Sequence, residues 1–333
     1  MTLEDFLGQW DDASDVIEVH TSGSTGKPKK LLVEKKRMEA SARITCDFLG
    51  LKEGDTALLC MPLDYIAGKM VVVRSLVRNL RLVDVTPSSH PLKNISETLD
   101  FAAMVPLQVS SSLQVAEEAE RLKSILHLII GGGAIDESLE SQLRQFPNAV
   151  WSTYGMTETL SHIALRRISG KESSLWYSPF DSVDVGLASD GCLEIYAPAV
   201  NPEKLKTNDI AELRTLADGK KQFRILGRKD NVIDSGGIKI QIEEVERLLR
   251  PHLKCGYQIT KVPNARLGEA VTLLVDTLNK EGLAEICRAV LPKHWVPRHI
   301  LTVKPLPMTG TGKPARAEAE GLASVIIRES MNP

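Results

Sequence analysis

Apolar residues recur along the chain with two spacings, one typical of helices and one typical of buried strands. Met38, Ala42, Thr45 and Leu49 share one face of a predicted helix over residues 34–49, which Gly50 would end. A second helix is predicted over residues 65–80, and short apolar runs predict strands at 57–61, 82–85, 101–105 and 125–130. Strands that alternate with helices in this way are typical of an α/β sheet with covering helices.

The pattern changes twice after Trp151. Strands become shorter and turns more frequent, which predicts a β-rich subdomain that ends near Leu226. Beyond Asp230 a short amphipathic helix, stopped by Pro251, is followed by two strand-and-helix units. We therefore expect a large N-terminal domain over residues 1–229 and a small α+β domain over residues 230–333.

Composition narrows the classes of function. The 333 residues are 43% hydrophobic and carry a net charge of −2, so no overall field attracts nucleic acid or an anionic membrane. The five cysteines have no metal-ligand or disulfide spacing and are expected to be buried thiols. Residues 66–85 are apolar but contain Lys69, Arg74, Arg78 and Arg81, so no membrane insertion is expected. The acidic N-terminus lacks a signal-peptide pattern, which favours a cytoplasmic location.

A polar loop follows the apolar run at residues 16–19. Its hydroxyls, glycines and lysines could surround a phosphate, because glycines turn backbone N–H groups inward and lysines neutralise charge. The spacing differs from that of the common nucleotide-binding loop, and a solvated hairpin is the alternative. The residues concerned are Thr21, Ser22, Gly23, Ser24, Thr25, Gly26, Lys27 and Lys29.

Three later segments give this loop a context. They are Ser152-Thr153-Tyr154-Gly155-Met156-Thr157-Glu158, then Gly227-Arg228-Lys229-Asp230 leading to Ser235-Gly236-Gly237, and finally residues 307–313 with Lys313 at the end. In this order, the set resembles the acyl-adenylate-forming enzymes, which include acyl- and aryl-CoA synthetases, peptide-synthetase adenylation domains and luciferases. The resemblance runs from about residue 16 to about residue 316.

The resemblance implies an ATP-dependent ligase that uses Mg²⁺ and coenzyme A. Lys27, Lys29 and the loop hydroxyls would hold the β- and γ-phosphates, Thr157 would donate to the α-phosphate, and Glu158 would bind Mg²⁺. Tyr154 would stack on adenine beside a backbone wall formed by Gly131, Gly132 and Gly133, with Ser152, Thr153, Gly155 and Met156 completing the motif. Each residue also has an ordinary structural explanation, such as a core tyrosine, a glycine turn or a helix start.

The same resemblance assigns residues in the C-terminal third of the chain. Asp209 would accept from the ribose hydroxyls, although Asn208 stands where the family has glycine, and Arg228 would reach the ribose or a phosphate. Asp230 would be the hinge of a mobile small domain. Lys313 would act only in adenylation. After a rotation, Ser235, Gly236 and Gly237 would line the channel for the pantetheine arm of CoA.

Three stretches, at residues 61–68, 105–108 and 159–164, resemble the o-succinylbenzoate–CoA ligases of menaquinone synthesis. The ring carboxylate of that acid needs a cation, for which Lys69 and Arg74 are candidates, with Gln108 and His162 as further pocket residues. Both cations could instead lie on an exposed helix face. Only 19 residues precede the phosphate loop, where the family has a larger lobe, so a short-form ligase is expected.

Other interpretations stay open. They are a ligase for another aryl or acyl acid, an enzyme that loads a carrier protein, and a catalytically silent nucleotide binder. A small carboxylic acid is the expected partner, and the sequence leaves a homo-oligomer open.

Overall fold

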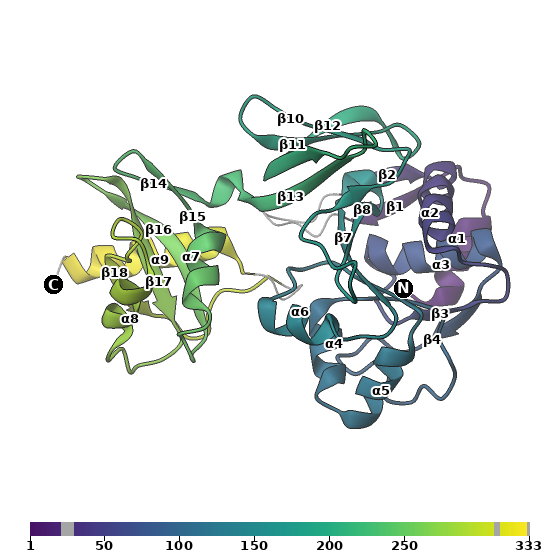
Figure 1. Cartoon of the computed structure of the whole chain (residues 1–333), viewed down its shortest axis with the longest axis horizontal. Coiled ribbons are helices and arrows are strands. Elements are labelled where there is room, and N and C mark those ends of the chain that lie inside the picture. The colour runs from purple at the N-terminus through teal and green to yellow at the C-terminus, as the bar shows by residue number, and fades with distance from the viewer. Residues whose placement is uncertain (21–29, 310–313, 332–333) are drawn as a thin grey trace. The chain divides into compact units, whose positions relative to one another are not determined.

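A computed structural model describes residues 1–20, 30–309 and 314–331 of the chain (Figure 1). The chain forms two compact units. The first comprises Met1–Ala188, Leu193–Thr207 and Glu212–Arg224, and the second comprises Ser189–Cys192, Asn208–Ala211 and Ile225–Pro333. The main division therefore falls between Arg224 and Ile225, a few residues before the boundary expected at 229/230.

A seven-stranded sheet is the centre of the first unit. Its order is β4-β3-β5-β6-β7-β8-β9, in which neighbours from β4 to β7 pair in parallel and the β7–β8 and β8–β9 pairs are antiparallel. Every residue of β3 and β5 is buried, as expected for parallel strands covered on both faces. The strands are β3 (Thr56–Leu59), β4 (Arg81–Asp84), β5 (Phe101–Met104), β6 (His127–Ile130), β7 (Ala149–Gly155), β8 (His162–Arg167) and β9 (Ser178–Pro179).

Helices cover this sheet, and the two longest agree with the predicted periodicity. In α2 (Lys35–Leu49), the residues Met38, Ala42, Thr45 and Leu49 are all buried, and Gly50 ends the helix in the left-handed conformation with φ of 68°. The second predicted helix is α3 (Ile66–Arg78), which packs against α2. The others are α1 (Leu3–Asp11), α4 (Pro106–Leu113), α5 (Ala116–Ser124) and α6 (Glu137–Leu143).

Two smaller sheets accompany the main one. Strands β1 (Val16–His20) and β2 (Lys30–Glu34) form an antiparallel pair, which periodicity did not predict as a pair. The β-rich subdomain is a four-stranded sheet of order β10-β11-β12-β13. Its strands are β10 (Asp184–Leu187), β11 (Cys192–Ala197), β12 (Asn201–Thr215) and β13 (Lys221–Arg228).

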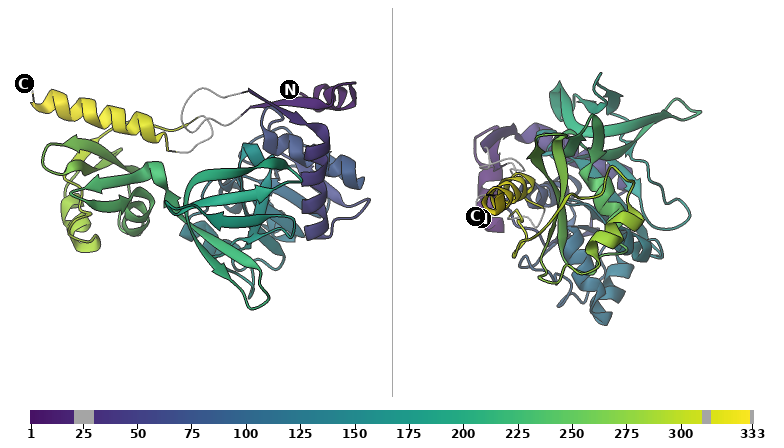
Figure 2. Two further views of the ribbon diagram at one scale, coloured as in Figure 1. Left: turned by 90° about the horizontal axis from the view of Figure 1, so that it is seen from above. Right: turned by 90° about the vertical axis from the view of Figure 1, so that its left-hand side faces the viewer.

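The second unit is an α+β layer structure. Its sheet has the order β15-β14-β17-β16, and β18 pairs in parallel with β17. Alternate residues of β17 enter two cores: Val271 and Leu273 pack with α7 and α8, whereas Ala270 and Leu274 pack with α9 on the other face (Figure 2). The elements are β14 (Val232–Ser235), β15 (Ile238–Gln241), α7 (Ile242–Leu249), β16 (Tyr257–Asn264), β17 (Gly268–Val275), α8 (Leu283–Val290), β18 (His299–Thr302) and α9 (Arg316–Met331).

Two expectations from composition can be compared with the structure. The five cysteines are free thiols, four of them buried and Cys255 partly buried. Among the helices in the described part of the chain, none is long and apolar enough to cross a bilayer.

Candidate functional site

Several predicted site residues of the first unit lie at the carboxyl edge of the parallel strands. Met104 pairs with Ile130, and Ile130 pairs with Ser152, so the residues that follow β5 and β6 lie beside the end of β7. In open α/β sheets, ligands bind at this edge. The topology therefore brings together three segments that are far apart in the sequence: residues 105–108, 131–133 and 153–158.

The glycines at this edge are required by close packing. A Cβ atom on Gly131 would lie 2.2 Å from Oγ1 of Thr153, and Gly132 has a φ of 76° with the Val105 side chain nearby. Only glycine fits such positions without displacing a neighbour. Close packing and a turn therefore explain the glycines at residues 131 and 132. The same packing leaves backbone without side chains at this edge, where a flat ligand could bind.

Tyr154 belongs to an aromatic cluster. Its ring packs edge-on against Phe223 at 5.0 Å and lies 5.8 Å from Tyr177, and Tyr177 stacks on Phe223. The hydroxyl of buried Ser152 is 2.8 Å from the Tyr177 hydroxyl. Ser152 therefore supports the cluster, while the ring of Tyr154 stays only partly buried and keeps surface for a ligand.

Thr157 and Glu158 lie in a tight turn between β7 and β8. The 3₁₀ helix η1 (Thr157–Thr159) begins after Met156, whose N–H donates to the Thr159 hydroxyl at 3.0 Å. A Cβ atom on Gly155 would lie 2.3 Å from the carbonyl oxygen of Ser161, so the turn closes directly onto Gly155. This closure leaves Thr157 partly exposed and Glu158 exposed.

The Glu158 carboxylate is available for a cation. Its backbone carbonyl accepts from Asn201 Nδ2 at 3.0 Å, but its side chain has no hydrogen bond or ion pair within the described residues. The described residues also contain no cluster of three His, Cys, Asp or Glu side chains able to hold a metal alone. One free carboxylate fits Mg²⁺, which is usually bound by one or two carboxylates together with substrate phosphates.

Arg74 is buried in the first unit, so the alternative that it lies on an exposed helix face is wrong. Its Nη2 donates to the Ser161 hydroxyl at 2.6 Å and to the Thr45 hydroxyl at 3.4 Å, whereas its Nε has no partner. No described carboxylate lies within ion-pair distance of it. Burial lowers the pKa of Arg74 to about 10, so the guanidinium is still charged at neutral pH.

His162 shares both of these hydroxyl partners. Its Nε2 is 3.1 Å from Thr45 Oγ1 and its Nδ1 is 3.2 Å from Ser161 Oγ. Burial, and then the charge of Arg74, hold the pKa of His162 well below its usual value of 6.5. The imidazole is therefore neutral at physiological pH and forms a buried polar network with Arg74, Thr45 and Ser161.

Lys69 is also buried, which makes the exposed-face alternative wrong here too, but it points to a different place. Its Nζ donates to the backbone carbonyl of Glu18 on β1 at 3.1 Å and lies 5.6 Å from the centre of the Phe6 ring. Burial lowers its pKa. Lys69 thus fastens α3 to the N-terminal elements, and Arg74 is the better placed of the two candidate cations.

The side chain of Gln108 forms hydrogen bonds to the backbone of the protein. Its Nε2 donates to the carbonyls of Cys60 at 2.9 Å and Ser88 at 3.0 Å, and its Oε1 accepts from the N–H of Val105 at 3.1 Å. These contacts fix the chain after β3 and β5. A direct contact between Gln108 and a substrate stays a prediction. In the structure, Gln108 holds the backbone at the carboxyl edge of the sheet in place.

In the second unit, Asp209, Arg228 and Asp230 lie together. Arg228 forms ion pairs with Asp209 at 3.5 Å and with Asp230 at 3.0 Å. Asn208, the residue that departs from the family pattern, donates from Nδ2 to Asp230 at 3.1 Å. The predicted ribose and hinge residues are therefore neighbours, and the asparagine has a partner of its own.

Ser235, Gly236 and Gly237 have a clear local role. Gly236 and Gly237 connect the antiparallel strands β14 and β15 with φ values of 63° and 81°. Positive φ at both central positions is typical of the tightest hairpin turn, which explains the two glycines. A contact with CoA stays a prediction.

Nine predicted residues lie outside the described part of the chain. They are Thr21, Ser22, Gly23, Ser24, Thr25, Gly26, Lys27 and Lys29 of the phosphate loop, and Lys313.

Sequence reasoning missed several members of the site. Ser161 and Thr45 complete the Arg74 network, and Tyr177 and Phe223 support Tyr154. One signal was present for Thr45, since it is a hydroxyl residue on the face of α2 that carries Met38, Ala42 and Leu49. Tyr177, which precedes β9, and Phe223, on β13, are distant in sequence from Tyr154 and gave no local signal.

Comparison with known proteins identifies the family of this chain. A model described as "AMP-binding enzyme" matches residues 9–187, which is more than half of the chain. The chain belongs to the AMP-binding enzyme family. The predicted resemblance and the α/β fold class are confirmed, and an AMP-forming ligase is the enzyme class that this family supports.

Three similar proteins illustrate the match. The 2-succinylbenzoate–CoA ligase of Listeria monocytogenes is 24% identical over 93% of this chain and 70% of that protein. An acyl-CoA synthetase (AMP-forming)/AMP-acid ligase II-like protein from Dyadobacter fermentans has a crystal structure that is 31% identical, covers 95% of this chain and 91% of that one, and has a TM-score of 0.63. The o-succinylbenzoate CoA synthetase of Bacillus subtilis, solved with ATP and magnesium, covers 91% of this chain and 69% of that one with 22% identity and a TM-score of 0.74, a likeness that bears on the fold.

The turn that carries Glu158 should not tolerate a side chain at Gly155. Gly155→Ala would force Cβ against the Ser161 carbonyl and should lower the free energy of unfolding by about 1–3 kcal/mol. Gly8→Ala in α1, where nothing lies within 4 Å of the added Cβ, is the control and should be neutral or slightly stabilising. Urea denaturation of both variants measures the difference, and equal stability would contradict the packing described.

Neutral His162 should make stability depend on pH. An unfolded histidine binds a proton near its ordinary value of 6.5, while the folded pKa lies well below it. Between the two values the unfolded state holds more protons, so stability rises with pH and is lost as pH falls below about 6.5. His162→Gln should flatten the dependence of Tm on pH between about 7.5 and about 5. An unchanged slope would show that the imidazole is not buried in its neutral form.

Proposed function

We propose that this protein is an AMP-forming acid–CoA ligase that converts o-succinylbenzoate to o-succinylbenzoyl-CoA through an acyl-adenylate. Membership of the AMP-binding family supports the reaction class, and curated relatives named 2-succinylbenzoate–CoA ligase support the acid. The observation on which the choice of acid depends is Arg74, a buried cation without a carboxylate partner among the described residues, beside the turn that carries Glu158. We place the reaction in the cytoplasm.

In the first step, an oxygen of the succinyl carboxylate attacks the α-phosphorus of ATP. The new O–P bond forms as the bond from that phosphorus to the β-phosphate oxygen breaks, which releases pyrophosphate. Both reactants are anions, so catalysis depends on positioned charges and donors. We assign donation to the α-phosphate to Thr157, neutralisation of the β- and γ-phosphates to Lys27 and Lys29, and neutralisation between the carboxylate and the α-phosphate to Lys313.

Mg²⁺, when bound with ATP, would neutralise phosphate charge, and the exposed carboxylate of Glu158 is the residue that fits it. Adenine would bind at the carboxyl edge between the partly buried ring of Tyr154 and the backbone of Gly131–Gly133. The Arg228–Asp209 pair supplies a carboxylate that can accept from ribose hydroxyls.

In the second step, the CoA thiol gives its proton to water, and its sulfur attacks the acyl carbonyl carbon. The C–S bond forms, the C–O bond to AMP breaks, and AMP leaves. We propose that the residues from 230 onward move about Asp230 between the steps, so that Lys313 serves adenylation and Ser235–Gly237 approach the pantetheine arm in thioester formation.

Arg74 accounts for selection of a dicarboxylic acid. A buried charge without a counter-charge is costly, and a carboxylate of the substrate would compensate it. The Ser161 and Thr45 hydroxyls and neutral His162 hold the guanidinium in place without neutralising it. A buried guanidinium that keeps its charge is suited to the ring carboxylate of o-succinylbenzoate.

One observation favours a second candidate. The 31% identical relative has a name that specifies no acid, so a ligase for another aryl or acyl acid is the alternative. A panel of acids assayed for ATP-dependent pyrophosphate release, with and without CoA, separates the candidates and also reveals an enzyme that uses a carrier protein instead of CoA.

Loss of the Glu158 charge should stop adenylation without unfolding the protein. Glu158→Gln should lower the rate of pyrophosphate release by about 10²–10³-fold, because one preorganised electrostatic contact is removed. Glu203→Gln, which changes an exposed carboxylate on β12 outside every motif, is the control. Near-normal release by a folded Glu158→Gln variant would remove Glu158 from the site.

The ring carboxylate should be recognised through Arg74. The wild type should prefer o-succinylbenzoate over 4-oxo-4-phenylbutanoate, which lacks only that carboxylate, and Arg74→Met should reduce kcat/KM for the dicarboxylate by about 10²-fold or more. Activity toward 4-oxo-4-phenylbutanoate should change little in the same variant. Arg78→Met, which removes a more exposed arginine of α3 paired with Asp47, is the matched control. Equal use of both acids by the wild type would refute the assignment of o-succinylbenzoate.

A further inference from the structure

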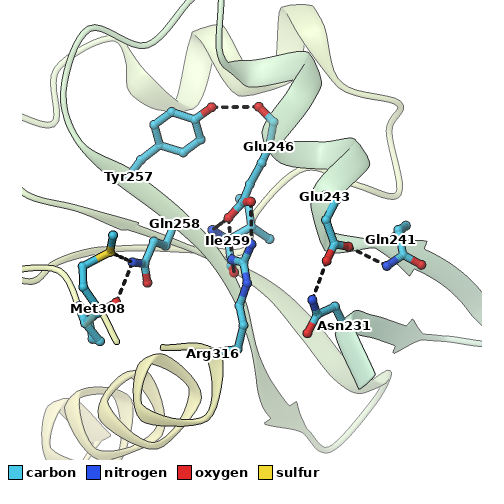
Figure 3. Close-up of polar contacts among 10 residues, drawn as sticks. Asn231, Gln241, Glu243, Glu246, Tyr257, Gln258, Ile259, Met308 and Arg316 are labelled. Atoms are coloured by element: carbon cyan, nitrogen blue, oxygen red, sulfur yellow. Dashed lines mark hydrogen bonds and ion pairs between the residues drawn. The ribbon is translucent and has the colours of Figure 1, made fainter. Parts of the chain in front are cut away.

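A partly buried ion pair lies at the start of α9, in the second unit. Arg316 donates from Nη1 and Nη2 to the two carboxylate oxygens of Glu246 on α7, at 2.6 and 2.7 Å (Figure 3). The two side chains are only 23% and 14% exposed. A two-point contact of this kind fixes direction as well as distance.

The same pair is fastened to β16. The N–H of Ile259 donates to Glu246 Oε1 at 2.9 Å, and Arg316 Nη1 donates to the carbonyl of Ile259 at 3.1 Å. The Tyr257 hydroxyl donates to the backbone carbonyl of Glu246 at 2.7 Å (Figure 3). One residue at the beginning of α9 is thus held by a helix and a strand at once.

The chain just before residue 309 is also attached to β16. Gln258 on β16 is buried, and its Nε2 donates to the carbonyl of Pro307 at 2.8 Å. That carbonyl also accepts from the N–H of Ala315 at 3.0 Å, and Met308 forms an antiparallel bridge with Pro314. The residues on the two sides of 309–313 are therefore joined to each other and to β16.

These contacts exceed what is needed to attach α9. The helix already packs through Ala319 and Ala323 on the core formed with Val262, Ala270 and Leu274. A partly buried ion pair is also a modest source of stability, because partial desolvation of both charges offsets their attraction. The Glu246–Arg316 pair and Gln258 instead give the chain a defined position on each side of residues 309–313.

We propose that Arg316, Glu246 and Gln258 are positioning residues for adenylation, which fix the two ends of the segment that carries Lys313. This inference rests on the proposed function, in which Lys313 acts in the first half-reaction only. A lysine side chain has many rotamers, so a fixed attachment is needed to bring its ammonium group to one place repeatedly. Misplacement of a reacting group by about 1 Å costs about 10²-fold in rate.

The test separates the two half-reactions in the full-length protein. Adenylation is followed as pyrophosphate release at saturating ATP and acid, and thioester formation is followed from supplied acyl-adenylate and CoA. Arg316→Gln and Glu246→Gln should each lower kcat of adenylation by about 10–10²-fold with KM for ATP nearly unchanged. Thioester formation should keep its wild-type rate, and Arg316→Lys should recover part of the adenylation rate.

Lys261→Gln is the matched control. It removes a comparably buried ion pair from the same sheet, the 2.8 Å contact between Lys261 and Glu269, without touching the flanks of the segment. Both half-reactions should be normal in this variant. If it slows adenylation as much as Arg316→Gln does, or if Arg316→Gln slows both half-reactions equally, the effect is general destabilisation and the inference is overturned.

A double variant shows whether Arg316 acts through the lysine. Residues that act as one unit give non-additive losses, so Lys313→Ala with Arg316→Gln should be no slower in adenylation than Lys313→Ala alone. Additive losses would overturn the positioning role. If Lys313→Ala leaves adenylation intact, it is the proposed function that fails, whatever Arg316→Gln does.

Gln258→Leu supplies a second route if the charge variants do not fold. Its Oε1 has no partner in the described structure, so its removal leaves fewer buried groups unsatisfied. It should slow adenylation selectively, in the same direction as Arg316→Gln. A folded Gln258→Leu variant with normal adenylation would remove Gln258 from the proposal.

Discussion

The parallel pairing of β3, β5, β6 and β7 is the constraint on which the rest of the first unit depends. Parallel strands in register end at one edge, so whatever follows them in sequence becomes a set of neighbours. The hydrogen-bonded ladder is buried on both faces and tolerates little change. Close packing then requires glycine at particular positions of that edge, as Gly131 beside Thr153 and Gly155 beside Ser161 show. Bare backbone and a tight turn at the edge are consequences of this packing.

The charged residues of the predicted site differ in their burial and in their partners. Arg74 is held in the interior by hydroxyl groups, where a charge keeps its full effect because little water screens it. Glu158 is at the surface of a turn, where a hydrated cation can reach it. Arg228 lies between two aspartates, so its own charge is largely neutralised. Groups of the same chemical type thus have different uses according to burial and partners.

Much of the fold was predictable from local patterns. The apolar face of α2, the existence of α3 and the buried runs of β3, β5 and β6 follow directly from apolar spacing, and the motifs supplied residues that lie at the carboxyl edge. The sequence left both a buried and an exposed position open for Arg74, because only the neighbours of a charged helical residue decide between them. Tertiary contacts between distant residues, such as Tyr154 with Phe223 and Glu246 with Arg316, also left no local signal. The division of the chain near Arg224 depends on which residues are in contact in the folded structure, and the spacing of apolar residues does not predict these contacts.

The isolation of Arg74 has a consequence for the amount of protein in a cell. A fold that leaves a buried cation uncompensated is less stable alone than with an anion bound to it. Any acid whose carboxylate compensates that charge binds the native state preferentially, so it shifts the folding equilibrium by mass action. Unfolded molecules are the ones that proteases remove, and a change of one or two kcal/mol alters abundance several-fold. With the acid bound at Arg74 as proposed, the folded enzyme would be more stable and would be degraded more slowly when substrate is plentiful.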